Sequence, residues 1–90
     1  MKINRQVKVF GKVQGVFFRQ STLYKAIELG IRGWVKNEKD GTVVTEIEGT
    51  EPQVTSMVEW LRKGPSSAIV ERLESKACEP KGYTDFQVIR

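Results

Sequence analysis

Residues 11–20, GKVQGVFFRQ, combine groups that proteins use to bind an anion. Gly15 lets the backbone curl and approach a ligand closely. The residues after it begin a predicted helix, whose unpaired N–H groups and dipole favour negative charge. Arg19 adds a permanent charge and a two-pronged donor that matches phosphate or carboxylate oxygens. The segment therefore predicts an anion-binding loop that leads into Arg19 and consists of Gln14, Gly15, Val16, Phe17 and Phe18.

The apolar side chains of this loop are expected to have different tasks. Val16 and Phe18 should anchor the loop to the core, while Phe17 should shape the mouth of the pocket. The alternative is a tight turn followed by a helix whose first-turn arginine, Arg19, meets solvent as most charged side chains do.

Asn37 is the second residue that could do chemistry, because it ends a predicted strand that follows the first helix. A strand–helix–strand crossover makes the two strands parallel, so that their carboxyl ends lie at the same edge of the sheet. Arg19 and Asn37, 18 positions apart, could then face one pocket. Turn chemistry is the alternative for Asn37, since asparagine is common before a hairpin turn.

Several other chemistries lack the residues that they need. The loop is neither a nucleotide P-loop nor a dinucleotide fingerprint. With no histidine and one cysteine, Cys78, the chain cannot build a His-based triad or the usual Cys/His zinc site. Position 84, six residues after Cys78, is threonine rather than arginine, so a thiolate phosphatase loop is not supported.

Strand and helix patterns alternate along the chain. Strands are predicted over residues 5–12, 31–37, 42–49, 68–76 and 86–90, with a loop over 79–85. The first helix is predicted over 19–29, with Gly30 at its end and one apolar face made of Leu23, Ala26 and Ile27. Thr50 and Gln53 have the form of a capping box for a second helix, which residues 63–65 close. Its apolar positions are Val54, Met57, Val58 and Leu61.

This order, β-α-β-β-α-β with a terminal strand, is typical of the α+β ferredoxin-like fold. We expect a single domain over residues 1–90, with two helices packed on one face of a mainly antiparallel sheet of four to five strands. Trp34 should pack in the sheet or core, and Trp60 should lie partly in the core. Glu46 and Glu48 should lie on a solvated strand face.

The net charge of +4 is unevenly distributed, since residues 1–36 carry eight Lys or Arg and a single acid, Glu28. Anion binding is thus expected in the first half, although charge alone favours a solvated basic face. The apolar fraction of 39% and the charged fraction of 29% are those of a globular chain, and no apolar run reaches membrane-spanning length. One cysteine suits a reducing compartment. We expect a cytoplasmic monomer without membrane or nucleic-acid partners.

Three stretches carry a resemblance to a known family. GKVQGVFFR closely resembles the acylphosphatase signature, roughly G-x-V-Q-G-V-x-F-R, and GWVKNEKDGTV at 33–43 resembles the family's second signature. EWLRKGPSSAIVERLE at 59–74 looks like the family's usual third stretch, so that the resemblance covers essentially the whole chain. The sequence departs at Phe17, where many bacterial relatives have glycine, and this departure bears on substrate preference.

The resemblance implies hydrolysis of the carboxyl-phosphate bond of acyl phosphates such as acetyl phosphate, carbamoyl phosphate and bisphosphoglycerate, without a metal, a cofactor or a covalent intermediate. The family's phosphate-binding arginine falls on Arg19, its water-orienting asparagine on Asn37 and its phosphate loop on residues 14–18. The expected partners are a small acyl phosphate and inorganic phosphate. Two alternatives stay open: a regulatory acylphosphatase-like domain without turnover, and an RNA-binding ferredoxin-like module, although the RNA-recognition signature is absent.

Overall fold

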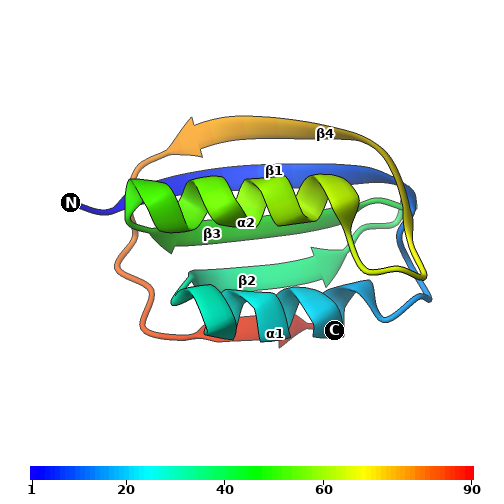
Figure 1. Cartoon of the computed structure of the whole chain (residues 1–90), viewed down its shortest axis with the longest axis horizontal. Helices are drawn as coiled ribbons and strands as arrows, with labels where there is room; N and C mark the ends of the chain where they lie inside the picture. Colours follow the sequence, from blue (N-terminus) through cyan, green and yellow to red (C-terminus); the bar gives the residue numbers. More distant parts are fainter.

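The chain folds into five strands and two helices, and the computed structural model describes all 90 residues (Figure 1). The strands are β1 (Ile3–Lys12), β2 (Arg32–Asn37), β3 (Val43–Gly49), β4 (Ile69–Cys78) and β5 (Phe86–Ile89). The helices are α1 (Phe18–Leu29) and α2 (Glu51–Lys63). Every predicted element is present, and the observed ends differ from the predicted ones by at most two residues.

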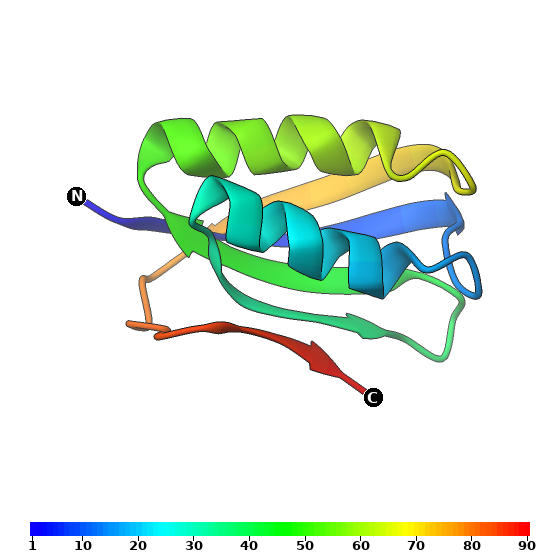
Figure 2. The ribbon, with the colours of Figure 1, turned by 60° about the horizontal axis from the view of Figure 1, so that its bottom comes forward.

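The five strands form one sheet in the order β4-β1-β3-β2-β5. Neighbouring strands are antiparallel except β2 and β5, which are parallel. Since β1 and β2 both run antiparallel to β3 between them, they point the same way and end at the same end of the sheet. Both helices cover one face of the sheet (Figure 2). The prediction of a ferredoxin-like βαββαβ fold is confirmed.

The core lies between the sheet and the helices. Alternate strand residues point to this side, because successive side chains of a strand face opposite ways; the buried ones include Val7, Val9, Val35, Val43 and Ile47. Helix α2 contributes a stripe of buried residues, namely Val54, Met57 and Leu61. Neither helix is long and apolar enough to cross a membrane.

The ends of both helices follow the local sequence. The capping box at the start of α2 is present: Thr50 N–H donates to Gln53 Oε1 at 2.8 Å, and Gln53 N–H donates to Thr50 Oγ1 at 3.4 Å. Gly30 ends α1 in the left-handed region, with φ 76°. Short-range signals of this kind need no tertiary partner, which is why the sequence predicts them.

Helix α1 packs through a face that shares only Ala26, of its buried residues, with the predicted one. Its buried residues are Phe18, Thr22 and Ala26, a row at i and i+4 spacing, whereas Ile27 is 65% exposed. The ring of Phe18 lies 6.0 Å from that of Trp60 on α2. Because Phe18 is fixed in the core at the first residue of the helix, the residues one and two turns later face the sheet. The prediction for Ile27 was therefore wrong.

Glu46 and Glu48 are buried, so the prediction that they lie on a solvated face was wrong. They point to the face without helices, yet they are only 4% and 1% exposed. The segment between β4 and β5 must pass from one edge of the sheet to the other (Figure 1), and it meets these carboxylates on the way. Glu48 accepts hydrogen bonds from the N–H groups of Lys81, Gly82 and Tyr83 at 2.7, 2.9 and 3.1 Å.

Hydrogen bonds keep both buried carboxylates ionised. Burial raises the pKa of Glu48, but hydrogen bonds from Asn4 and from the N–H groups of residues 81–83 outweigh it, so that the pKa lies below its ordinary value of 4.5. Burial acts on Glu46 in the same way, and hydrogen bonds from Lys81 and Asn4 again lower the pKa overall. These carboxylates hold the segment that delivers β5 to the edge of the sheet beside β2.

Candidate active site

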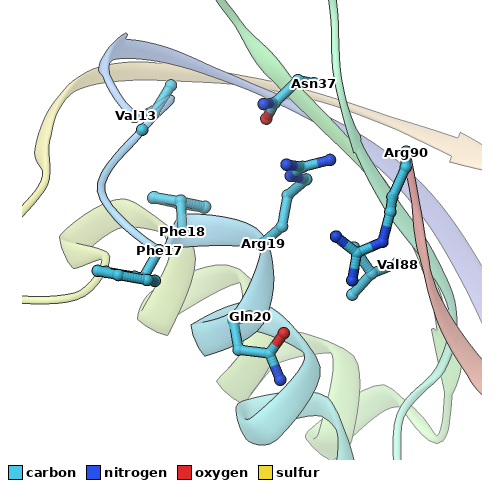
Figure 3. A pocket seen from close by; sticks show the side chains of 9 residues that line it. Val13, Phe17, Phe18, Arg19, Gln20, Asn37, Val88 and Arg90 are labelled. Atoms are coloured by element: carbon cyan, nitrogen blue, oxygen red, sulfur yellow. The ribbon is translucent and has the colours of Figure 1, made fainter.

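An open cavity of about 420 Å³ lies where β1 and β2 end (Figure 3). Its lining includes two arginines and no acidic residue, so it is suited to an anion. The lining residues are Val13, Gly15, Phe17, Phe18, Arg19, Gln20, Asn37, Val88 and Arg90. Arg19 and Asn37, which the sequence predicted to converge, therefore line one cavity.

The loop between β1 and α1 presents backbone donors to this cavity. Gly15 has φ 73°, and Phe17, the residue before α1, has φ 60°, so the chain turns sharply into the helix. No side chain caps the start of α1, and its first turn contains no acidic residue. The first N–H groups of the helix, from Phe18 onward, are consequently available to an anion.

Two contacts fix the loop from outside the cavity. Ser67, in the segment between α2 and β4, donates through Oγ to the carbonyl oxygen of Val16 at 2.9 Å. Val16 and Phe18 pack against the core, whereas Phe17 is 81% exposed at the rim of the cavity. The loop is therefore anchored on both sides of Phe17.

Gln14 connects the loop to the hairpin that follows Asn37. Its Nε2 donates to the carbonyl oxygens of Glu38 and Thr42, at 2.7 and 2.8 Å. Neither Gln14 nor Val16 is among the residues that line the cavity. The side chain of Gln14 instead sets the distance between the loop and the end of β2.

The hairpin itself is stiffened by Asp40. Its Oδ1 accepts hydrogen bonds from Thr42 Oγ1 at 2.6 Å and Thr42 N at 3.0 Å, and Lys8 Nζ lies 3.0 Å from Oδ2. The two bonds from Thr42 and the contact with Lys8 hold the pKa of Asp40 at about 2. The turn next to Asn37 is thus held in place at neutral pH.

Arg19 is oriented by the last strand. One of its terminal nitrogens donates to the carbonyl oxygen of Ile89 at 3.2 Å, and Figure 3 shows its guanidinium directed toward Asn37. Strand β5 pairs with β2 in parallel, with Ile89 opposite Lys36, and this pairing places Ile89 close to the end of β2. The fork of Arg19 keeps further N–H donors for a ligand.

Sequence reasoning missed the contribution of β5. Val88 and Arg90 line the cavity and Ile89 holds Arg19, but residues 86–90 read only as a short final strand. No local signal in FQVIR shows that this strand pairs with β2. Gln20 was also missed, although its place one residue after Arg19 in the first turn of the helix could have suggested it.

The fold and the cavity together define a small α+β protein with a basic cavity, suited to an anion, at the end of the sheet where β1 and β2 finish. Comparison with known proteins identifies the family to which the chain belongs. The acylphosphatase family model matches residues 5–88. An acylphosphatase of Thermococcus kodakarensis is 41% identical over 88 residues, covering 98% of this chain and 97% of the relative.

Solved structures agree. The chain superposes on an acylphosphatase from Coxiella burnetii with a TM-score of 0.94 and 40% identity, covering 98% of this chain and 93% of that one. An acylphosphatase from Bacillus subtilis gives the same TM-score at 30% identity, with 98% and 99% coverage. The chain belongs to the acylphosphatase family, and it is a hydrolase of acyl phosphates.

Proposed function

We propose that the chain hydrolyses the carboxyl-phosphate bond of small acyl phosphates, of the acetyl phosphate, carbamoyl phosphate and bisphosphoglycerate class, by direct in-line attack of water. The products are a carboxylate and inorganic phosphate. The observation that carries the proposal is the convergence of Arg19 and Asn37 in one cavity beside the uncapped start of α1.

The phosphoryl group would be bound by backbone and arginine together. In phosphoryl transfer, charge is spread over the equatorial oxygens of phosphorus, and fixed donors aimed at that charge lower the barrier. The N–H groups of the loop and of the first turn of α1 supply such donors without reorganisation. Arg19, held by the carbonyl of Ile89, supplies the permanent charge and a planar fork.

Asn37 would orient the attacking water on the opposite side of phosphorus from the acyl group. The water oxygen forms the new bond to phosphorus while the bond to the acyl oxygen breaks, and the water proton passes to solvent or to the phosphate. The leaving group is a carboxylate, which departs without protonation. A general acid is therefore not required. Because the transition state is loose, the attacking water is only weakly bonded to phosphorus, and a strong general base is not required either. No Asp, Glu, His or Cys side chain lines the cavity.

Hydrolysis of an aromatic acyl phosphate, followed by its absorbance, tests the proposal. Wild-type protein should turn it over at an unchanged rate after dialysis against a strong chelator, and phosphate monoesters should be poor substrates. Arg19→Ala should abolish turnover, whereas Arg62→Ala, at an exposed position in the last turn of α2, should not change it.

The outcomes separate the alternatives. A folded wild-type protein that binds phosphate without turnover would be a regulatory domain. A rate that collapses with chelator and returns with magnesium would refute the metal-free mechanism. Undiminished turnover in Arg19→Ala would remove this residue from the site.

A further inference from the structure

Phe17 adopts a backbone conformation that suits it poorly. Its φ of 60° and ψ of 25° are in the left-handed region, and it is the only residue other than glycine with a positive φ. For a bulky side chain this region is unfavourable, and such conformations persist only where the surrounding structure imposes them. The fixed neighbours on either side, Val16 and Phe18, impose it here.

The fold gains nothing from the ring of Phe17. The side chain is 81% exposed, while both neighbours pack against the core. The aromatic pair at this helix start is made by Phe18 and Trp60 instead, and no Lys or Arg lies over the ring of Phe17. Folding stability therefore does not explain a large aromatic residue at this position.

The ring lies where the acyl group of a substrate must leave the phosphate. Phe17 lines the same cavity as Arg19 and Asn37, and Figure 3 shows its ring pointing away from Asn37. In an in-line displacement the attacking water and the leaving group are on opposite sides of phosphorus. If Asn37 holds the water, the acyl group extends to the side of the cavity remote from Asn37.

We propose that Phe17 is a specificity-determining residue whose exposed ring packs against the acyl group, so that acyl phosphates with aromatic or extended apolar acyl groups are preferred over acetyl phosphate. This inference rests on the proposed function of the same site. Contact between an exposed aromatic ring and an apolar group removes apolar surface from water, which favours binding. Stacking of two aromatic rings adds a further favourable contribution. Acetyl phosphate offers only a methyl group, which covers little of the ring.

The test compares kcat/KM for benzoyl phosphate and acetyl phosphate in wild type and Phe17→Ala. Loss of an aromatic contact should lower the ratio of benzoyl to acetyl phosphate by about twofold to twelvefold. The lower ratio should result from a lower kcat/KM for benzoyl phosphate, mainly through a higher KM. The kcat/KM for acetyl phosphate should be nearly unchanged. Phe17→Tyr keeps the ring and should keep the ratio.

Two further variants separate specificity from backbone effects. Phe17→Gly suits the left-handed conformation, so it should unfold at an equal or higher denaturant concentration than wild type while losing the same selectivity. Tyr24→Ala removes an exposed aromatic side chain of α1 that does not line the cavity; Tyr24 is 63% exposed. This variant should leave the ratio unchanged.

An unchanged ratio in a folded Phe17→Ala, or an equal loss for both substrates, would overturn the role of Phe17 while leaving the proposed function intact. Failure of the wild-type protein to hydrolyse either substrate would instead refute the proposed function itself.

Discussion

Replacing Gln14 by alanine tests how the site is assembled, because this side chain joins the loop between β1 and α1 to the hairpin that carries Asn37. Both of its hydrogen bonds end on carbonyl groups that are 24 and 28 residues away in sequence. In Gln14→Ala the loop and the hairpin lose this link. We therefore expect two effects, a lower free energy of unfolding and a lower turnover.

The loss of stability follows from the hydrogen bonds removed. Each part-buried bond contributes about 0.5–1.5 kcal/mol net, so that two are worth about 1–3 kcal/mol. Neither carbonyl oxygen is left without a hydrogen-bond donor in the variant, so the larger penalty for an unsatisfied buried acceptor does not apply. The carbonyl oxygen of Glu38 still accepts a hydrogen bond from Gly41 N–H at 3.2 Å, and the carbonyl oxygen of Thr42 still accepts one from Glu38 N–H at 2.9 Å. For a domain of this size, a loss of about 2 kcal/mol lowers Tm by about 8–16 °C.

The loss of turnover follows from the position of Asn37. A shift of about 1 Å between a positioning group and the reacting atoms can cost roughly 100-fold in rate. Phosphate inhibition should change less, since Arg19 and the first turn of α1 are not bonded to Gln14. Gln14→Met, which keeps the bulk of the side chain and removes its donors, is the matched control for a packing defect.

Urea denaturation and steady-state kinetics on the same preparations decide the matter. Gln14→Ala and Gln14→Met should lose similar amounts of stability and turnover if the hydrogen bonds carry the effect. Normal turnover in either variant at a temperature where it is fully folded would show that Gln14 does not position Asn37. Unchanged stability in both would refute the energetic argument.

Three further outcomes are expected. Arg19→Lys keeps the charge but loses the planar fork, so turnover and phosphate inhibition should both weaken strongly; near-normal kinetics would show that charge alone suffices. Asn37→Ala should lower turnover on the order of 100-fold to 1,000-fold with phosphate inhibition retained, whereas retained turnover would leave Asn37 a turn residue. The pKa of Glu48 is below 4.5 in the folded protein, so its contribution to stability is complete above that value and is lost as pH falls through the folded pKa. Glu48→Gln should thus be less stable than wild type at pH 7, by about 1–3 kcal/mol, and should lose less stability on acidification; equal acid sensitivity in urea titrations would contradict this account.

The sequence alone determined the features that depend on neighbouring residues. The capping box of Thr50 and Gln53, the glycine that ends α1 and the Asp-Gly turn before β3 each act within a few residues. The order of strands and helices followed from the spacing of apolar residues. The strand–helix–strand crossover makes the two strands parallel, and this placed Arg19 and Asn37 at one end of the sheet. Their convergence could be predicted because it needs only local structure and one rule of chain connection.

The tertiary structure alone decided which polar groups would lose contact with water. Glu46 and Glu48 alternate with the buried Ile47, as the residues of a solvated strand face do. Their burial depends on a segment more than 30 residues later in the chain, which crosses to the far edge of the sheet. The same crossing brings β5 to β2, and with it the carbonyl of Ile89 that holds Arg19.

The conformation of Phe17 and the partners of Gln14 belong to the same category. The left-handed φ of Phe17 results from Val16 and Phe18 being fixed in the core, and no local preference of phenylalanine would suggest it. Gln14 meets the carbonyls of Glu38 and Thr42 only after β1, β2 and β3 have paired. Hydrogen bonds over such separations are fixed by strand order and register, which depend on how the whole chain buries its apolar surface.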